Sequence, residues 1–183
     1  TSLIASDKLD TNSYYFFIKH LIFIGLGALI LFFLSILKED ILIKISLILF
    51  FITLVFLLMV PFVGIEVKGS KRWLDLGILP RFQPIELLKP YFIIFVSILL
   101  CLNKNIFYKY LLSGIVLVPV ILLLISQPDL GQTLLITMVW LTLIFVSGIN
   151  IYFFFLFFIF SISISTYLIF FVSKFEYIKI RLL

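Results

Sequence analysis

The chain alternates between long apolar runs and short polar segments, and the lengths of the apolar runs predict membrane-crossing helices. A crossing helix needs roughly 20 mostly apolar residues, because the hydrocarbon layer is about 30 Å thick and each helical residue rises about 1.5 Å. Several runs come close to this length with few or no charged residues. They are residues 21–37, which the aromatic residues 14–17 extend, and residues 45–65, 87–102 and 110–128.

Residues 130–173 contain no charged side chain, and as one helix they would be roughly twice as long as the bilayer is thick. We therefore expect two crossings, with a turn at the Ser-Gly-Ile-Asn of residues 147–150. Residues 1–6 have the character of the end of another helix. The runs lack the alternation of barrel strands. The prediction is an all-α, polytopic membrane protein with six full crossings and the end of a seventh, in one transmembrane domain over residues 1–183.

Composition supports an integral membrane protein, because 64% of the 183 residues are hydrophobic, 13% are charged and 23 are phenylalanine. The single cysteine, Cys101, excludes an internal disulfide and a metal-binding cysteine cluster. The net charge of +5 is spread over the segment ends instead of forming one basic tract. Nucleic acid is therefore not an expected partner, whereas anionic lipid headgroups and phosphates are.

Charge alone leaves the orientation of the chain open. With these crossings, 10 of the 14 Lys and Arg lie on the side that carries the long loop at residues 66–86, and the other 4 lie opposite. Positive loops normally face the cytoplasm. A cluster that binds an anionic substrate would break this rule, because its charges would then serve binding instead of topology.

The long loop has two parts. Residues 66–77 predict a flexible basic segment, in which Lys71 and Arg72 stand beside Trp73, an indole that suits the membrane interface. Residues 80–89 predict the start of a helix, because Pro84 fits the first turn and the Glu86 carboxylate favours the positive helix end.

Charged residues at the start of the helix predicted at 87–102 are the main candidate for function. Lys89 follows Glu86 by three residues, so the two can pair on one face. Together with Arg81 they predict a charged group at membrane depth, where such residues are costly and usually paired or functional. The plain alternative is an interfacial loop closed by the Glu86–Lys89 pair, without any substrate.

Three motifs, in this order, resemble the SEDS family of FtsW, RodA and SpoVE, and within it the FtsW branch. They are the sequences KGSKRWLDLG at residues 68–77, QPIELLKP at 83–90 and QPDLGQT at 127–133. Ser70 replaces the usual alanine, Ile85 replaces serine or alanine, and Gln132 displaces the threonine of the last motif to Thr133. The family fold has ten helices, of which this chain covers the part from late in the first to just past the seventh.

The resemblance implies a bacterial inner-membrane protein of the division septum that polymerises lipid II into glycan strands, with undecaprenyl pyrophosphate as the leaving group. The loop at 66–86 would then be periplasmic, against the charge count. Arg81 and Lys89 are the expected pyrophosphate contacts, and Glu86 is expected to orient Lys89. The remaining expected substrate-binding residues are Lys71, Arg72, Trp73 and Gln83.

The same resemblance places the general base, an aspartate, beyond Leu183, so polymerisation by this chain alone is not expected. Asp129 is predicted to cap the N-terminus of the helix that follows it instead of acting as the base, because aspartate is favoured at helix N-terminal caps. Asp129, Gly131 and Pro84 are therefore assigned supporting roles. No cofactor and no metal site are assigned, although the use of a divalent cation is left open.

Two other functions stay open. A lipid II flippase would use the same basic groups without needing a base. A division scaffold would bind a class B penicillin-binding protein and other divisome proteins through apolar helix faces such as residues 153–160. The elongation role of RodA also stays open, because the two branches share the central motifs.

Overall fold

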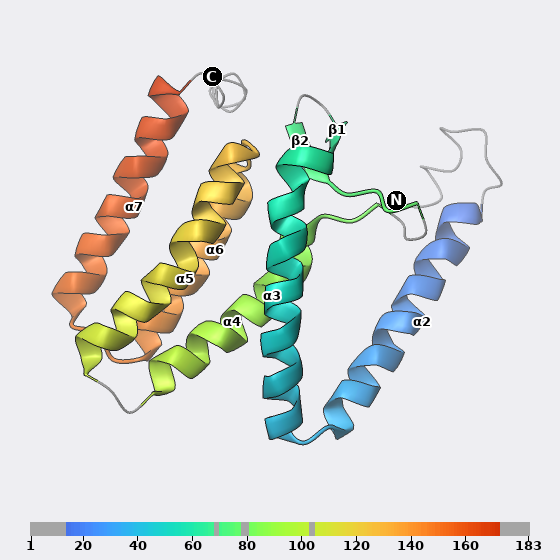
Figure 1. The fold of residues 1–183 in the computed structure, drawn as a ribbon, viewed down its shortest axis with the longest axis horizontal. Helices are drawn as coiled ribbons and strands as arrows, with labels where there is room; N and C mark the ends of the chain where they lie inside the picture. The colour runs from blue at the N-terminus through green and yellow to red at the C-terminus, as the bar shows by residue number, and fades with distance from the viewer. Residues whose placement is uncertain (1–13, 68–69, 78–80, 103–104, 173–183) are drawn as a thin grey trace. The chain divides into compact units, whose positions relative to one another are not determined.

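The computed structural model describes residues 14–67, 70–77, 81–102 and 105–172. The chain divides into two compact units, Thr1–Lys44 and Ile45–Leu183, and each is considered by itself (Figure 1). The described helices are α2 (Tyr15–Ile36), α3 (Glu39–Val63), α4 (Pro84–Cys101), α5 (Ile106–Ser126), α6 (Leu130–Val146) and α7 (Ile151–Phe171). The strands are β1 (Ile65–Val67) and β2 (Ser70–Trp73).

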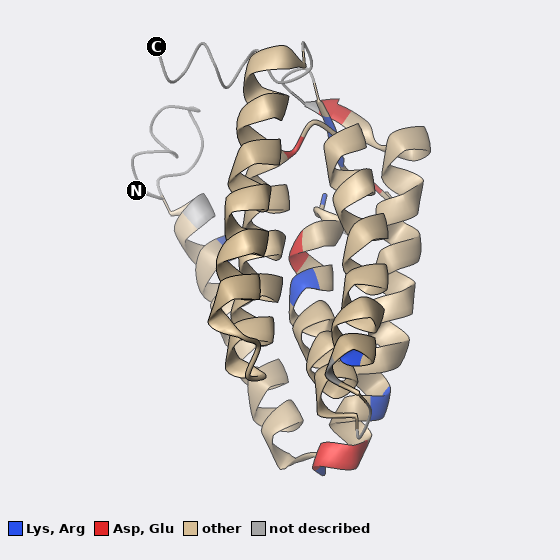
Figure 2. Ribbon diagram, turned by 90° about the vertical axis from the view of Figure 1, so that its left-hand side faces the viewer, with Lys and Arg blue, Asp and Glu red and all other residues tan. Residues whose placement is uncertain are grey.

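The helices confirm the predicted polytopic membrane fold. Five of them, α2, α3, α4, α5 and α7, are long and apolar enough to cross a membrane, and α6 is a shorter apolar helix of 17 residues. Figure 2 shows long stretches of helix without a charged residue. The predicted turn at 147–150 is confirmed between α6 and α7. The helix end predicted at residues 1–6 lies outside the described residues.

In the first unit, α2 is apolar on all sides after Lys19 and His20, and most of its large apolar side chains are exposed. Such a surface is typical of a helix that faces lipid. Its last turn is tightened, since the backbone N–H of Leu37 donates to the carbonyl of Leu34, three residues earlier, at 3.2 Å.

The second unit has an apolar core built by α3, α4, α5 and α6. In Figure 1, α5, α6 and α7 run alongside one another, and the contacts of α6 with both of its neighbours agree with that view. None of the described residues of α7 is fully buried. The helix packs on the core through Phe154, Phe157 and Phe158.

The connection between α3 and α4 differs from its prediction. A flexible segment was expected at residues 66–77, but β1 and β2 form an antiparallel hairpin in which Glu66 stands opposite Lys71. The hairpin continues into a bridge between Leu74 and Phe82, whose backbones bond each other at 3.0 and 3.2 Å. The prediction was wrong because the two strands are only three and four residues long, too short to show a clear alternation of apolar and polar residues.

Gly64 connects α3 to the hairpin and has no room for a side chain. Its backbone N–H donates to the Val60 carbonyl at 2.8 Å, which holds it against the last turn of α3. A Cβ atom on Gly64 would collide with the Val60 carbonyl oxygen. The hairpin therefore leaves α3 at a point that only glycine fits.

We expect Gly64→Ala to lower the thermal unfolding midpoint of the full protein in detergent, with a loss of about 1–3 kcal/mol from the forced backbone shift. Gly114→Ala is the matched control, because a Cβ there meets no atom within 4 Å and alanine favours a helix over glycine. Equal midpoints for the two variants would contradict the account of Gly64.

Candidate functional site

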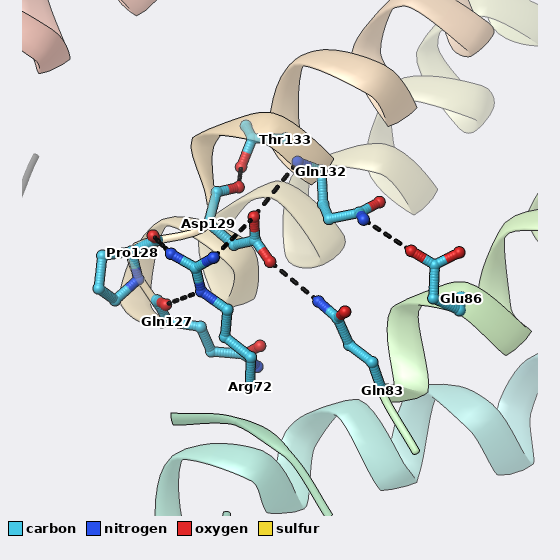
Figure 3. A network of polar contacts seen from close by, with 8 residues as sticks. All are labelled: Arg72, Gln83, Glu86, Gln127, Pro128, Asp129, Gln132 and Thr133. Carbon is cyan, nitrogen blue, oxygen red and sulfur yellow. Dashed lines mark hydrogen bonds and ion pairs between the residues drawn. The ribbon is translucent and has the colours of Figure 1, made fainter. Parts of the chain in front are cut away.

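The turn between α5 and α6 is the centre of a polar network in the second unit (Figure 3). Asp129, which is 5% exposed, caps α6 as predicted, with its Oδ1 accepting from the Gln132 backbone N–H at 3.4 Å. Its Oδ2 accepts from the Gln83 side-chain amide at 2.9 Å. Its Oδ1 also lies 3.6 Å from the Arg72 guanidinium. Both oxygens of this carboxylate are engaged, which suits an anchor more than a proton acceptor.

Arg72 binds the same turn from β2. Its Nε donates to the Gln127 carbonyl at 3.4 Å, and its terminal nitrogen donates to the Pro128 carbonyl. The last carbonyls of a helix lack partners within it and carry partial negative charge, so a cation there stabilises the helix end. The guanidinium thus joins the hairpin to the end of α5 and to Asp129.

Gln127 ties the turn to α3. Its buried side-chain amide donates to the Leu57 carbonyl at 3.3 Å. In a regular helix that carbonyl would accept from the residue four positions later, but this residue is Pro61, which has no N–H. The Gln127 amide supplies the donor that Pro61 removes, as apolar surroundings require.

Glu86 and Lys89 form the predicted ion pair at the start of α4, with the Lys89 Nζ 2.7 Å from the Glu86 Oε2. The Lys89 side chain is 18% exposed and that of Glu86 is 51% exposed. The other carboxylate oxygen of Glu86 accepts from the Gln132 side-chain amide at 2.7 Å. Among the described residues Glu86 is the polar partner of Lys89, and an ammonium has three N–H donors, so donors are left for a ligand or water.

Arg81 binds Asp75 instead of joining this pair in the described contacts. Its Nε lies 3.1 Å from the Asp75 Oδ2, and its side chain is 64% exposed. The backbone N–H of Gly77 and, after it, the Arg81 side chain hold the pKa of Asp75 below its ordinary value. The pair is therefore intact at neutral pH and would weaken only as pH falls through that lowered pKa.

Strand β2 separates Lys71, Arg72 and Trp73, which are neighbours in the sequence, onto two faces. Alternate residues of a strand point to opposite faces. Arg72 is half-buried toward the turn, while Lys71 and Trp73 are exposed. The structure thus brings Arg72, Gln83, Glu86, Lys89 and Asp129 into one network and leaves Lys71 and Trp73 on the outer face. Their predicted substrate contacts stay predictions.

Sequence reasoning missed two members of the network, Gln127 and Gln132. Pro61 carried a signal for the first, because a proline within a crossing helix orphans a carbonyl that some other donor must satisfy. For the second, the signal was the departure of Gln132 from the motif. Pro84 and Glu86 do lie in the first turn of α4, as predicted. Within the described residues, no group of three or more His, Cys, Asp or Glu could hold a metal ion.

An apolar cavity of about 1060 Å³ lies between α5, α6 and α7. The hydroxyls of Thr137, Ser161 and Ser165 line it, and each donates to a carbonyl of its own helix. The cavity therefore offers shape and apolar surface but little polar chemistry, so the polar network is the stronger candidate site.

The fold and this network define a polytopic helical membrane protein whose polar groups gather where one loop and two helix starts meet. Residues 1–182 match the family model of FtsW, RodA and SpoVE, described as cell cycle proteins. The chain belongs to this family.

Individual relatives agree with that membership. The chain is 30% identical over 157 residues to the probable peptidoglycan glycosyltransferase FtsW of Coxiella burnetii, covering 82% of this chain and 42% of the relative. A crystal structure of a variant of the Thermus thermophilus rod shape determining protein RodA matches at 27% identity and a TM-score of 0.68, covering 85% of this chain and 52% of that one. A third match, from a structure of a peptidoglycan synthase complex, has 29% identity and a TM-score of 0.70, covering 87% of this chain and 48% of its own. The chain thus spans about half the length of these relatives or less.

Gln127→Met should destabilise the full protein by about 1–3 kcal/mol, because it leaves the buried Leu57 carbonyl without a donor. In a Pro61→Ala background residue 61 regains its N–H, so the same substitution should cost clearly less. Thermal midpoints of the parent, both single variants and the double variant test this coupling. Additive shifts would contradict the assignment of Gln127 as the substitute donor.

Proposed function

We propose that the complete protein is a peptidoglycan glycosyltransferase that polymerises lipid II during bacterial cell division. Lys89 carries the proposal, since its largely covered ammonium is fixed by Glu86 and keeps donors for an anionic ligand at the end of a membrane helix. Intramembrane charges held in this way are usually functional. Relatives named peptidoglycan glycosyltransferase support the reaction class.

In the proposed reaction, a sugar hydroxyl of one molecule forms a bond to the anomeric carbon of another. The bond from that carbon to the pyrophosphate oxygen breaks, and undecaprenyl pyrophosphate leaves with the electron pair. Fixed cations lower this barrier because negative charge develops on the leaving group. We assign Lys89 and the exposed Arg81 to this charge, with Lys71, Trp73 and Gln83 along the substrate.

The hydroxyl proton must pass to a base. Asp129 is not proposed for this role, because Gln83, Arg72 and the Gln132 backbone already occupy its carboxylate. The base is expected beyond Leu183, as the family resemblance implies. We place the polar network on the periplasmic side of the inner membrane, where lipid-linked precursors are polymerised.

A crosslinking partner is part of the proposal. The matched chain belongs to a peptidoglycan synthase complex that coordinates polymerisation and crosslinking. That likeness favours a class B penicillin-binding protein as the partner of this protein at the septum. A flippase remains a competing function on sequence grounds.

Lys89→Ala and Arg81→Ala in the full protein should abolish glycan synthesis from purified lipid II without lowering membrane abundance, because each removes a charge that the pyrophosphate needs. Lys109→Ala, at the start of α5 and so at the opposite end of that helix from the turn, is the matched control and should retain synthesis. Normal polymer from both test variants would refute the assignment. Lipid II translocation by the parent without any polymer would favour the flippase.

Arg72→Ala should behave differently from Arg81→Ala. It removes the cation that joins two carbonyls of the turn to Asp129, so we expect a lower thermal midpoint as well as lower activity. Arg81→Ala should leave the midpoint near that of the parent, since exposed ion pairs contribute roughly 0–1 kcal/mol. An unchanged midpoint for Arg72→Ala would argue that its contacts with the turn are dispensable.

A further inference from the structure

Gln132 lies at the third position of α6 and connects the helix cap to the ion pair. Its backbone N–H donates to Asp129, while its side-chain amide donates to Glu86 on α4. A glutamine at this position often bonds the backbone N–H of the capping residue. Here the Asp129 N–H donates to the Leu124 carbonyl at 3.0 Å. The Gln132 side chain therefore reaches across to another helix.

The other end of the Gln132 amide is buried and unsatisfied. Its Oε1 has no hydrogen-bond partner among the described residues. Turning the amide over would set this oxygen against the Glu86 carboxylate, which accepts but cannot donate when ionised. Such an orphaned acceptor costs stability. The Gln132 side chain thus makes the hydrogen bond to Glu86 while its own Oε1 is left without a donor among the described residues.

The contact fixes both oxygens of the Glu86 carboxylate. Oε1 accepts from Gln132 and Oε2 pairs with Lys89, each at 2.7 Å. Without Gln132, this half-exposed carboxylate could rotate and take up more than one donor of the Lys89 ammonium. The ammonium would then have fewer donors for a ligand.

We propose that Gln132 is a positioning residue: by holding Glu86, it keeps the Lys89 ammonium directed at the pyrophosphate of the lipid-linked substrate. The proposal rests on the proposed function of the same site. Because the family motif has threonine where this chain has Gln132, the device is a property of this chain and is not implied by the resemblance.

The test measures lipid II affinity and thermal midpoint for the full protein in nanodiscs. Gln132→Met keeps the side-chain length but removes both the donor and the orphaned oxygen. We expect its midpoint to equal or exceed that of the parent, while lipid II affinity falls roughly tenfold, the change that about 1.4 kcal/mol produces. Gln127→Met is the matched control and should lower the midpoint.

The same substitution is repeated in a Glu86→Gln background to show whether Gln132 acts through Glu86. There it should change lipid II affinity little. An equal tenfold loss in that background would mean that Gln132 contacts the ligand directly, which overturns the positioning role. Parent affinity in Gln132→Met, or a midpoint as low as that of Gln127→Met, would also overturn it. If the parent neither binds nor polymerises lipid II, the proposed function itself fails, whatever Gln132 does.

Discussion

The buried part of the polar network answers one constraint: where neither water nor lipid can complete hydrogen bonds, the protein must satisfy the broken helix ends itself. The turn between α5 and α6 meets this demand with one residue from β2 and two residues of its own. Arg72 donates to its carbonyls, the Asp129 side chain accepts from the Gln132 N–H of α6, and the Gln127 amide donates to the Leu57 carbonyl of α3. The groups that close the helices are therefore also the groups that hold the hairpin and α4 beside the candidate site.

Features determined by neighbouring residues could be predicted from the sequence. The crossings follow from apolar length, the start of α4 follows from Pro84 and Glu86, and the cap at Asp129 follows from its place before an apolar run. The pairing of Glu86 with Lys89 belongs to the same class, because one helical turn separates them. In each case the partner lies within a few residues, so the local pattern contains the answer.

Features that join distant segments could not be predicted in this way. The hairpin, which turns Lys71 and Trp73 away from Arg72, is a local structure that was missed for another reason: its strands of three and four residues give little alternation to recognise. The partner of Arg72 is a turn more than fifty residues away in the chain. Gln132 meets Glu86 only because α4 and α6 pack together. The sequence identifies the charged residues of the loop, but the packing of the helices determines which of them contact one another.

The hydrogen bond from Gln127 to α3 also gives a direction to sequence change. If Pro61 is replaced first, the Leu57 carbonyl has a donor within its own helix, and glutamine can then be lost without leaving that carbonyl bare. If Gln127 is lost first, the chain must pass through a form with an unmet acceptor in the core. Of the two mutational orders that reach the same final sequence, the one that replaces the proline first avoids this intermediate, so sequences that diverge from this one should lose the proline before the glutamine.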